Sequence, residues 1–133
     1  QGVEVYIAPT YDSGDNWIGP LRHIAREGRC WVVGCGNLLR GSDLPDDFPE
    51  KKRAVSGRGG VGQPRDSPVV APDGEIAAGP LRKQAGILYC DIDRQQVGLA
   101  RRTLDVAGHY ARPDIFSLRV NTRPQPAVEF DDA

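Results

Sequence analysis

Two apolar runs in the first quarter of the chain predict strands. Val3–Ala8 is apolar-rich from its first residue, and Cys30–Cys35 is short and continuously apolar, as in strands that are covered on both faces. We therefore expect both segments to be central, buried strands.

The residues between these runs have helical spacing. Trp17, Leu21 and Ile24 recur on one side, while the charged residues fall on the other, so we expect a helix from about Trp17 to Glu27. Pro20 is tolerated only in the first turn of a helix, which favours a start near Trp17. A strand, a helix and a second strand favour an α/β layer, although this order leaves open that the helix belongs to one wall of a sandwich.

The second half of the chain predicts a hairpin, a further strand, a second helix and a last strand. The turn at Asp73-Gly74 supplies the positive φ of a tight hairpin, and Asp93 followed by Gln96 resembles a capping box. Phe116 and Leu118 begin an alternating pattern of a half-buried strand. The expected ranges are Pro68–Ala71 and Glu75–Ala78 for the hairpin, Gly86–Ile92 for the strand, Asp93–Val106 for the helix and Phe116–Val120 for the last strand.

The segment Arg40–Arg65 is rich in Pro, Gly and charge, and we interpret it as a long, exposed and mobile surface loop. Within it, the Gly-rich segment Gly57–Gly62 could suggest a phosphate-binding loop. It lacks the preceding strand, the following helix and the Lys-Ser/Thr of such a loop, so we interpret it as a flexible loop. The Pro-rich end, about residues 121–133, is predicted to be a tail. We expect residues 1–133 to form part of one domain, which includes this loop and this tail.

Charge and cysteine content narrow the classes of function. Lys plus Arg number 17 against 18 for Asp plus Glu, so no basic excess indicates nucleic acid or an anionic membrane as a partner. No apolar run is long enough to cross a bilayer and Gln1–Glu4 does not form a signal peptide, so we expect a cytoplasmic protein with reduced thiols. Because the chain contains no Met and opens directly into an apolar strand, we expect its first residue to lie inside a domain.

A thiolate activated by a histidine is the first chemistry to test. Cys30 and Cys35 are an odd number of positions apart on one strand, so their side chains should point to opposite faces, which disfavours a shared metal or a disulfide. We expect the thiols to be buried and His23 to be solvated. His109 lies in a turn where Arg112 and Asp114 can pair, and we expect that group to be structural.

Several motifs, in order, resemble those of the nitrilases, a family of carbon-nitrogen hydrolases. Gln1–Asp12 is similar to the segment that follows the catalytic cysteine in that family. The later matches are Arg22–Val32, Asp73-Gly74 with Ala78–Leu81, Gly86–Asp93 and Gly108–Phe116. The similarity covers nearly everything except about residues 51–64, and it implies the C-terminal half of an α-β-β-α sandwich.

The resemblance also implies a mechanism, in which a Cys nucleophile, a Glu base and a Lys convert a nitrile to a carboxylic acid and ammonia. These groups must act together on one carbon. By the order of the motifs, all three belong before Gln1. In the family, the nucleophilic Cys is followed by Trp and then by Glu. Here Cys30-Trp31 is followed by Val32, so no catalytic residue is assigned in this chain.

Thr10, Tyr11 and Trp17 match positions that help to form the wall of the substrate pocket in nitrilases. We expect no metal or cofactor, a nitrile as substrate only together with the missing half, and a homo-oligomer. Three hypotheses follow: an incomplete nitrilase that is inactive alone, an inactive or degenerate nitrilase-like interaction module that pairs with homologous subunits, or an independent Cys-His hydrolase. Arg65, where the family usually has Gly before Asp-Ser, is a departure consistent with degeneration.

Overall fold

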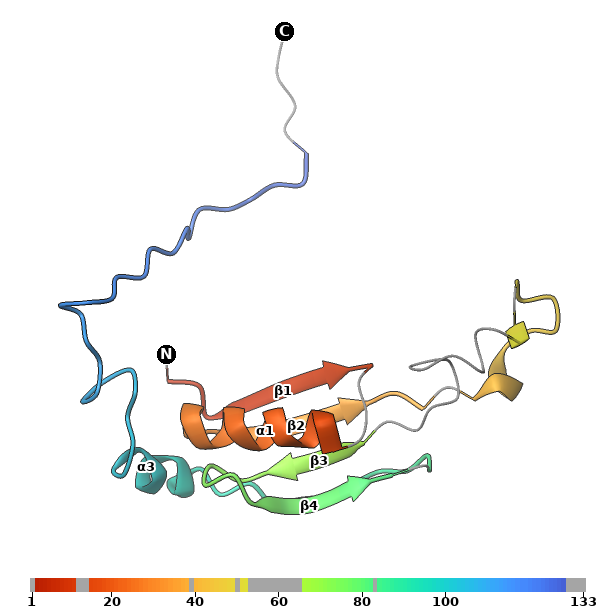
Figure 1. Ribbon diagram of the computed structural model, residues 1–133, viewed down its shortest axis with the longest axis horizontal. Helices are drawn as coiled ribbons and strands as arrows, with labels where there is room; N and C mark the ends of the chain where they lie inside the picture. The colour runs from red at the N-terminus through yellow and green to blue at the C-terminus, as the bar shows by residue number, and fades with distance from the viewer. Residues whose placement is uncertain are drawn as a thin grey trace, which may run out of the picture.

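A computed structural model describes residues 2–11, 15–38, 40–49, 51–52, 66–82 and 84–128. Strands and helices alternate in the first part of the chain, and a hairpin and a short helix follow (Figure 1). The elements are β1 (Val5–Thr10), α1 (Asp15–Gly28), β2 (Trp31–Gly36), the 3-10 helix η1 (Gly41–Asp43), β3 (Ser67–Val70), β4 (Ile76–Leu81) and α3 (Gln95–Arg101).

The four strands form one sheet in the order β1-β2-β3-β4. β1 and β2 are parallel and are joined by α1, whereas β3 pairs with β2, and β4 with β3, in the antiparallel direction. Figure 1 shows α1 lying across one face of this sheet and α3 at one end of it. The chain is therefore mixed α/β, as its sequence predicts.

Strand β2 is covered on both faces by alternating side chains. Val32 belongs to a buried cluster with Leu21 and Ala25 of α1, which lies on the helix-covered face. Trp31 points to the opposite face, into a second cluster with Val69 and with Val97 of α3. The prediction of a doubly covered strand is confirmed for this segment, with its bounds one residue later than expected.

Strand β1 is exposed on one face, so the prediction of a second buried strand is wrong. Ala8 is buried against α1, but Val5 and Ile7, which pair with Trp31 and Val33 on the other face, are 39% and 63% exposed. Among the described residues β1 pairs only with β2, so it forms an edge of the sheet. An apolar run predicts that a strand is buried, but it does not identify the chain segment that covers it.

Helix α1 starts at Asp15, two residues before the predicted start. Pro20 is therefore the sixth helical residue and lies beyond the first turn, where it removes one backbone hydrogen bond. Burial of Leu21 and Ala25 against the sheet stabilises the helix across this point, because packing outweighs propensity in a short helix.

The predicted hairpin is present. Gly74 has a φ of +90° at the turn, and its N–H donates to the Ala71 carbonyl over 2.8 Å. The turn also lies under α1, because Arg22 Nε donates to the Gly74 carbonyl over 2.7 Å. The β3–β4 hairpin is thus attached to the first helix as well as to the sheet.

Two elements predicted after the hairpin differ from the structure. Residues 86–92 belong to no strand or helix of the described structure, so the predicted strand is wrong. The following helix, α3, ends at Arg101 instead of Val106. Its N-cap is Arg94, which makes no side-chain cap hydrogen bond, and Asp93, the residue expected to cap it, accepts the Gln95 N–H over 2.8 Å. No helix among the described residues is long and apolar enough to cross a membrane.

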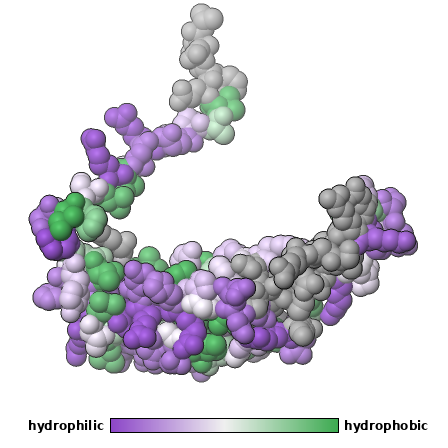
Figure 2. Space-filling model, in the orientation of Figure 1, coloured by the Kyte–Doolittle hydropathy of each residue, from purple (hydrophilic) through white to green (hydrophobic). Residues whose placement is uncertain are grey.

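The predicted last strand is also absent. Phe116, Leu118 and Val120 are exposed and their segment pairs with no strand, because nothing in the described structure offers this segment a ladder. Residues from about 109 onward leave the body of the molecule, and hydrophobic side chains are interspersed along them (Figures 1 and 2). Residues 121–128, the described part of the predicted tail, are exposed, and the tail over residues 121–133 stays a prediction.

Residues 40–49 and 51–52 of the predicted surface loop are largely exposed and contain η1, and the loop as a whole stays a prediction. The Gly-rich segment Gly57–Gly62 and residues 129–133 lie outside the described residues.

We expect Gly34→Ala to destabilise the fold by about 1 to 3 kcal/mol, because the new methyl group overpacks the contact between α1 and the sheet. A Cβ at Gly34 would lie 2.8 Å from both Leu21 Cδ1 and Pro68 Cδ. Gly19→Ala is the matched control, since a Cβ there meets nothing within 4 Å and raises helix propensity by up to about 1 kcal/mol. Urea unfolding of both variants measures the difference; equal stabilities would contradict the packing described here.

Candidate functional site

The carboxyl ends of the parallel strands β1 and β2 lie together at one edge of the sheet. Thr10, the last residue of β1, is in register with Gly36, the last residue of β2. Ligands of α/β proteins commonly bind at this edge, since the loops that follow parallel strands diverge there. A ligand site is therefore expected at this edge.

A cavity of about 450 Å³ opens at this edge, on the face of the sheet opposite α1. Its walls come from the end of β2 and the residues after it, from β3 and β4, and from the extended segment that follows β4. The lining residues are Val33–Leu38, Ser67, Val69, Leu81 and Gln84–Leu88. Its volume falls in the range of small-molecule pockets.

The three pocket residues predicted from the sequence lie at the same edge but do not line this cavity. Thr10 is half-buried and Tyr11 is exposed just beyond β1. Trp17 is in the first turns of α1 and packs against the cluster on the helix-covered face, with its indole nitrogen buried and without a partner in the described structure. Their role as a substrate wall remains a prediction.

The thiols differ in exposure. Cys30 is buried in the cluster under α1, and Cys35 is exposed and lines the cavity on the other face, which confirms that the two point in opposite directions. The expectation that all thiols are buried is wrong for Cys35, which is exposed at the end of β2. Cys90 is half-buried against the second cluster. Burial raises the pKa of the Cys30 thiol, and the nearby charge of Arg101 lowers it by less.

Arg82, which follows β4, ties three segments together beside the cavity. Its guanidinium donates to Asp15 in the first turn of α1 over 2.8 Å and lies 3.8 Å from buried Asp66, the residue before β3. The hydrogen bond to Asp15 is the main cause of the raised pKa of Arg82. These contacts position the cavity wall at Leu81 relative to the helix.

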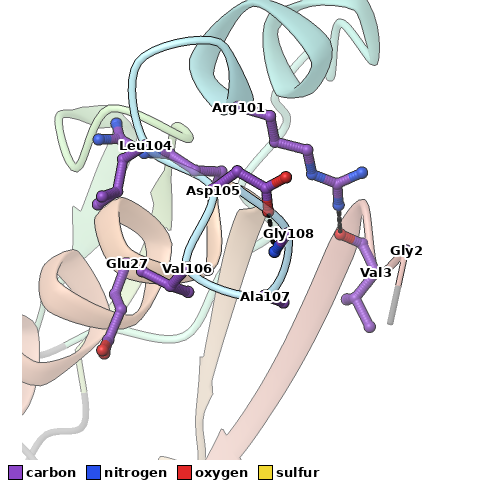
Figure 3. A pocket seen from close by; sticks show the side chains of 11 residues that line it. Gly2, Val3, Glu27, Arg101, Leu104, Asp105, Val106, Ala107 and Gly108 are labelled. Atoms are coloured by element: carbon purple, nitrogen blue, oxygen red, sulfur yellow. Dashed lines mark hydrogen bonds between the residues drawn. The ribbon is translucent and has the colours of Figure 1, made fainter. Parts of the chain in front are cut away.

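A second pocket, of about 350 Å³, lies between the N-terminus, the end of α1 and the turn after α3 (Figure 3). Three of its charged side chains contact the protein itself, whereas the buried Nε of Arg29 has no hydrogen-bond partner in the described structure. Arg101 donates to the Val3 carbonyl over 2.8 Å, and Asp105 accepts the Gly108 N–H over 3.1 Å. Glu27 lies 3.2 Å from His23. We interpret this pocket as a joint between α3 and the N-terminal segment.

The two histidines are not placed with a thiol. His23 is exposed on α1, as predicted, and the ring of His109 contacts that of Tyr110 edge-on at 5.0 Å. Neither histidine lines the cavity that contains Cys35. In the part of the chain that the structure describes, no three His, Cys, Asp or Glu side chains gather as metal ligands.

Comparison with known proteins shows the same relationship as the motifs. The chain is 41% identical to a nitrilase of Bradyrhizobium diazoefficiens over 96% of its own length, and 39% identical to an aliphatic nitrilase of Sinorhizobium fredii over 96%. It is 34% identical to nitrilase 3 of Arabidopsis thaliana over 98%. No protein-family model matches the chain.

These similarities make the chain a homologue of part of the nitrilases. It covers 39%, 41% and 38% of those three relatives, so it spans about two fifths of their length. The resemblance seen in the sequence motifs is confirmed.

We predict that the thiols react in the order Cys35, Cys90, Cys30. Exposure makes Cys35 accessible, whereas burial both hinders Cys30 and raises its pKa, which lowers its thiolate fraction. Timed alkylation of the native protein, followed by peptide mass spectrometry, measures each rate. Labelling of Cys30 as fast as Cys35 would contradict the burial of Cys30 under α1.

Stability should fall as the pH rises through the ordinary range of a thiol, about pH 8.5. The pKa of Cys30 is raised in the folded state, so the unfolded chain releases this proton first and gains stability relative to the fold. Urea midpoints across this pH range should decline less steeply for Cys30→Ala than for the unchanged chain. Gly19→Ala, which changes no titratable group, is the control and should decline as the unchanged chain does.

The ion pair of Arg112 and Asp114 is present as predicted, but both side chains are 59% exposed. The pKa of Asp114 is lowered mainly by its hydrogen bond to Arg112. Because solvent screens exposed pairs, we expect Asp114→Ala to leave the thermal midpoint nearly unchanged. A clear loss of thermal stability would instead show that this turn is buried in the assembled protein.

Proposed function

We propose that this chain forms part of a nitrilase, in which a nitrile is hydrolysed to a carboxylic acid and ammonia by a Cys nucleophile located N-terminal to Gln1. The observation that carries the proposal is the 41% identity to a nitrilase over 96% of the chain. The chain alone is proposed to be inactive, because the thiol, its base and the stabilising cation must act together on one carbon.

The surroundings of the three thiols support an external nucleophile. The sequence contains no Cys-Trp-Glu, and the only Cys-Trp, at Cys30, continues with Val32. Cys30 is buried under α1 with a raised pKa, which opposes formation of a thiolate. Cys35 is accessible, but among the residues that the structure describes no His, Glu or Lys lines its cavity, so none of them is placed to accept its proton or to stabilise charge.

The exposed side of the sheet supports a second layer, as in the α-β-β-α sandwich that the family resemblance implies. Val5 and Ile7 expose apolar surface on the face opposite α1, and Ile87 and Tyr89 beside it are 76% and 82% exposed. Large apolar patches and unpaired edge strands usually mark surfaces that bind other protein segments. We infer that the remaining part of a nitrilase covers this face, with Thr10, Tyr11 and Trp17 near the substrate.

A non-catalytic interaction module is the second candidate. The observation that favours it is the series of exposed apolar residues that leads away from the body, including Ile115, Phe116 and Leu118. Alternating apolar residues without a ladder are suited to pairing with a strand of another chain. A homologous subunit is the proposed partner in this case, in a homo-oligomer.

We predict that the purified chain releases no ammonia from nitriles, but does so when co-expressed with the N-terminal part of a nitrilase relative that contains Cys-Trp-Glu. Pairing should also suppress binding of a hydrophobic dye, because it covers Val5 and Ile7. Ammonia release and dye fluorescence are measured for each part separately and for the pair.

Two controls locate the nucleophile. Changing the Cys of Cys-Trp-Glu to Ala in the added part should abolish activity, whereas Cys90→Ala in this chain should keep it. Ammonia release by the chain alone, lost in Cys35→Ala, would support an independent hydrolase and overturn the proposal. A pair that forms, loses dye binding and stays inactive would favour the interaction module.

A further inference from the structure

Arg29, the residue after α1, has a backbone conformation that side chains disfavour. Its φ is 48°, in the left-handed region, and the next N–H, that of Cys30, donates back to the Ala25 carbonyl over 3.3 Å. This bond belongs to the Schellman C-cap, whose left-handed position is usually occupied by Gly. The cap therefore explains the backbone of Arg29, but not its side chain, since a side chain at this position costs stability relative to Gly.

The side chain of Arg29 has a second unfavourable feature. It lines the pocket of about 350 Å³ between the N-terminal segment, the end of α1 and the turn after α3, and its Nε is buried there without a hydrogen-bond partner in the described structure. A buried donor that lacks an acceptor is unfavourable, because it has lost water and gained nothing in return. An acceptor bound in the pocket would satisfy it.

The carboxylates of this pocket are directed elsewhere. The Glu27 carboxylate points away from Asp105 (Figure 3) and lies 3.2 Å from Nε2 of His23. Asp105 accepts the Gly108 N–H over 3.1 Å within its own turn. Neither contact satisfies the buried Nε of Arg29.

The rest of the lining suits a ligand with one negative charge and an apolar part. Arg101 adds a second guanidinium, which donates to the Val3 carbonyl over 2.8 Å, and Val3, Leu104 and Val106 add apolar side chains. A planar guanidinium matches the oxygens of a carboxylate. A monoanion fits better than a dianion, because the Asp105 carboxylate lies in the same pocket and repels negative charge.

We propose that this pocket binds a small aliphatic monocarboxylate, whose oxygen accepts the Nε–H of Arg29 and whose apolar part lies against Leu104 and Val106. This site goes beyond the proposed function. Val3 precedes β1 and Thr10 ends it, so the pocket lies at the opposite end of this strand from the cavity that contains Cys35. The bound carboxylate connects the end of α1 to the turn after α3.

A titration followed by nuclear magnetic resonance tests the site without any turnover. The isotopically labelled full chain is titrated with sodium butyrate at neutral pH and constant ionic strength, and separately with the neutral analogue butyramide and with sulfate, a dianion. We expect butyrate to shift the amide signals of Gly28, Arg29 and Gly108 saturably. Butyramide and sulfate should bind about ten-fold more weakly or less, because the first lacks the charge and the second carries too much of it.

Arg29→Gly separates the cost of this residue from its use. Gly fits the left-handed backbone and removes the guanidinium, so the urea midpoint of the ligand-free chain should rise while the butyrate shifts disappear. Arg29→Lys keeps the charge but lacks the Nε–H, and should bind butyrate about ten-fold more weakly. Arg26→Gln is the matched control, because it removes an exposed charge of α1 outside the pocket and should leave the affinity unchanged.

The proposal is overturned if butyrate gives no saturable shifts at these amides, if butyramide or sulfate binds as tightly, or if Arg29→Gly or Arg29→Lys binds as the unchanged chain does. An equal loss of binding in Arg26→Gln would also overturn it, because net charge would then explain the shifts. A lower urea midpoint for Arg29→Gly would show that Arg29 stabilises the fold itself, against the cost inferred here.

Discussion

The structure depends on one strand that must be covered on both faces. Val32 and Gly34 of β2 face α1, while Trp31 and Val33 face the opposite side, so two separate buried clusters share one backbone. Gly34 allows the helix to approach, since Leu21 and Pro68 already occupy the space a side chain would need. Trp31 holds the other face by donating its indole N–H to the Asp93 carbonyl over 3.0 Å.

The features that the sequence predicts correctly depend on nearby residues. The periodic apolar positions of α1 and the Asp73-Gly74 turn specify their own local geometry, so both could be found without knowledge of the partner. Strands are different, because a ladder needs a second segment at the right place. Residues 86–92 and 116–120 have strand-like patterns, but the described structure gives them no neighbour to pair with.

The candidate site was only partly accessible to sequence reasoning. The family motifs directed attention to Thr10 and Tyr11, and these residues do lie at the edge where the cavity opens. The cavity itself joins β2 to residues 84–88, which are about fifty positions away along the chain, and no local pattern reports such a contact. The odd spacing of Cys30 and Cys35 along the strand was informative, because it placed one thiol on each face of the sheet.

The long connection between β2 and β3 begins and ends at residues in direct contact, since the Gly36 N–H donates to the Ser67 hydroxyl. Its two ends are thus fixed by the sheet, whatever its length. Loop-closure entropy grows only logarithmically with length, by about 0.6 kcal/mol for each doubling, so insertions and deletions there disturb the fold little. Because Gly36 and Ser67 also line the cavity, changes in the residues next to them can alter the lining while the sheet stays unchanged.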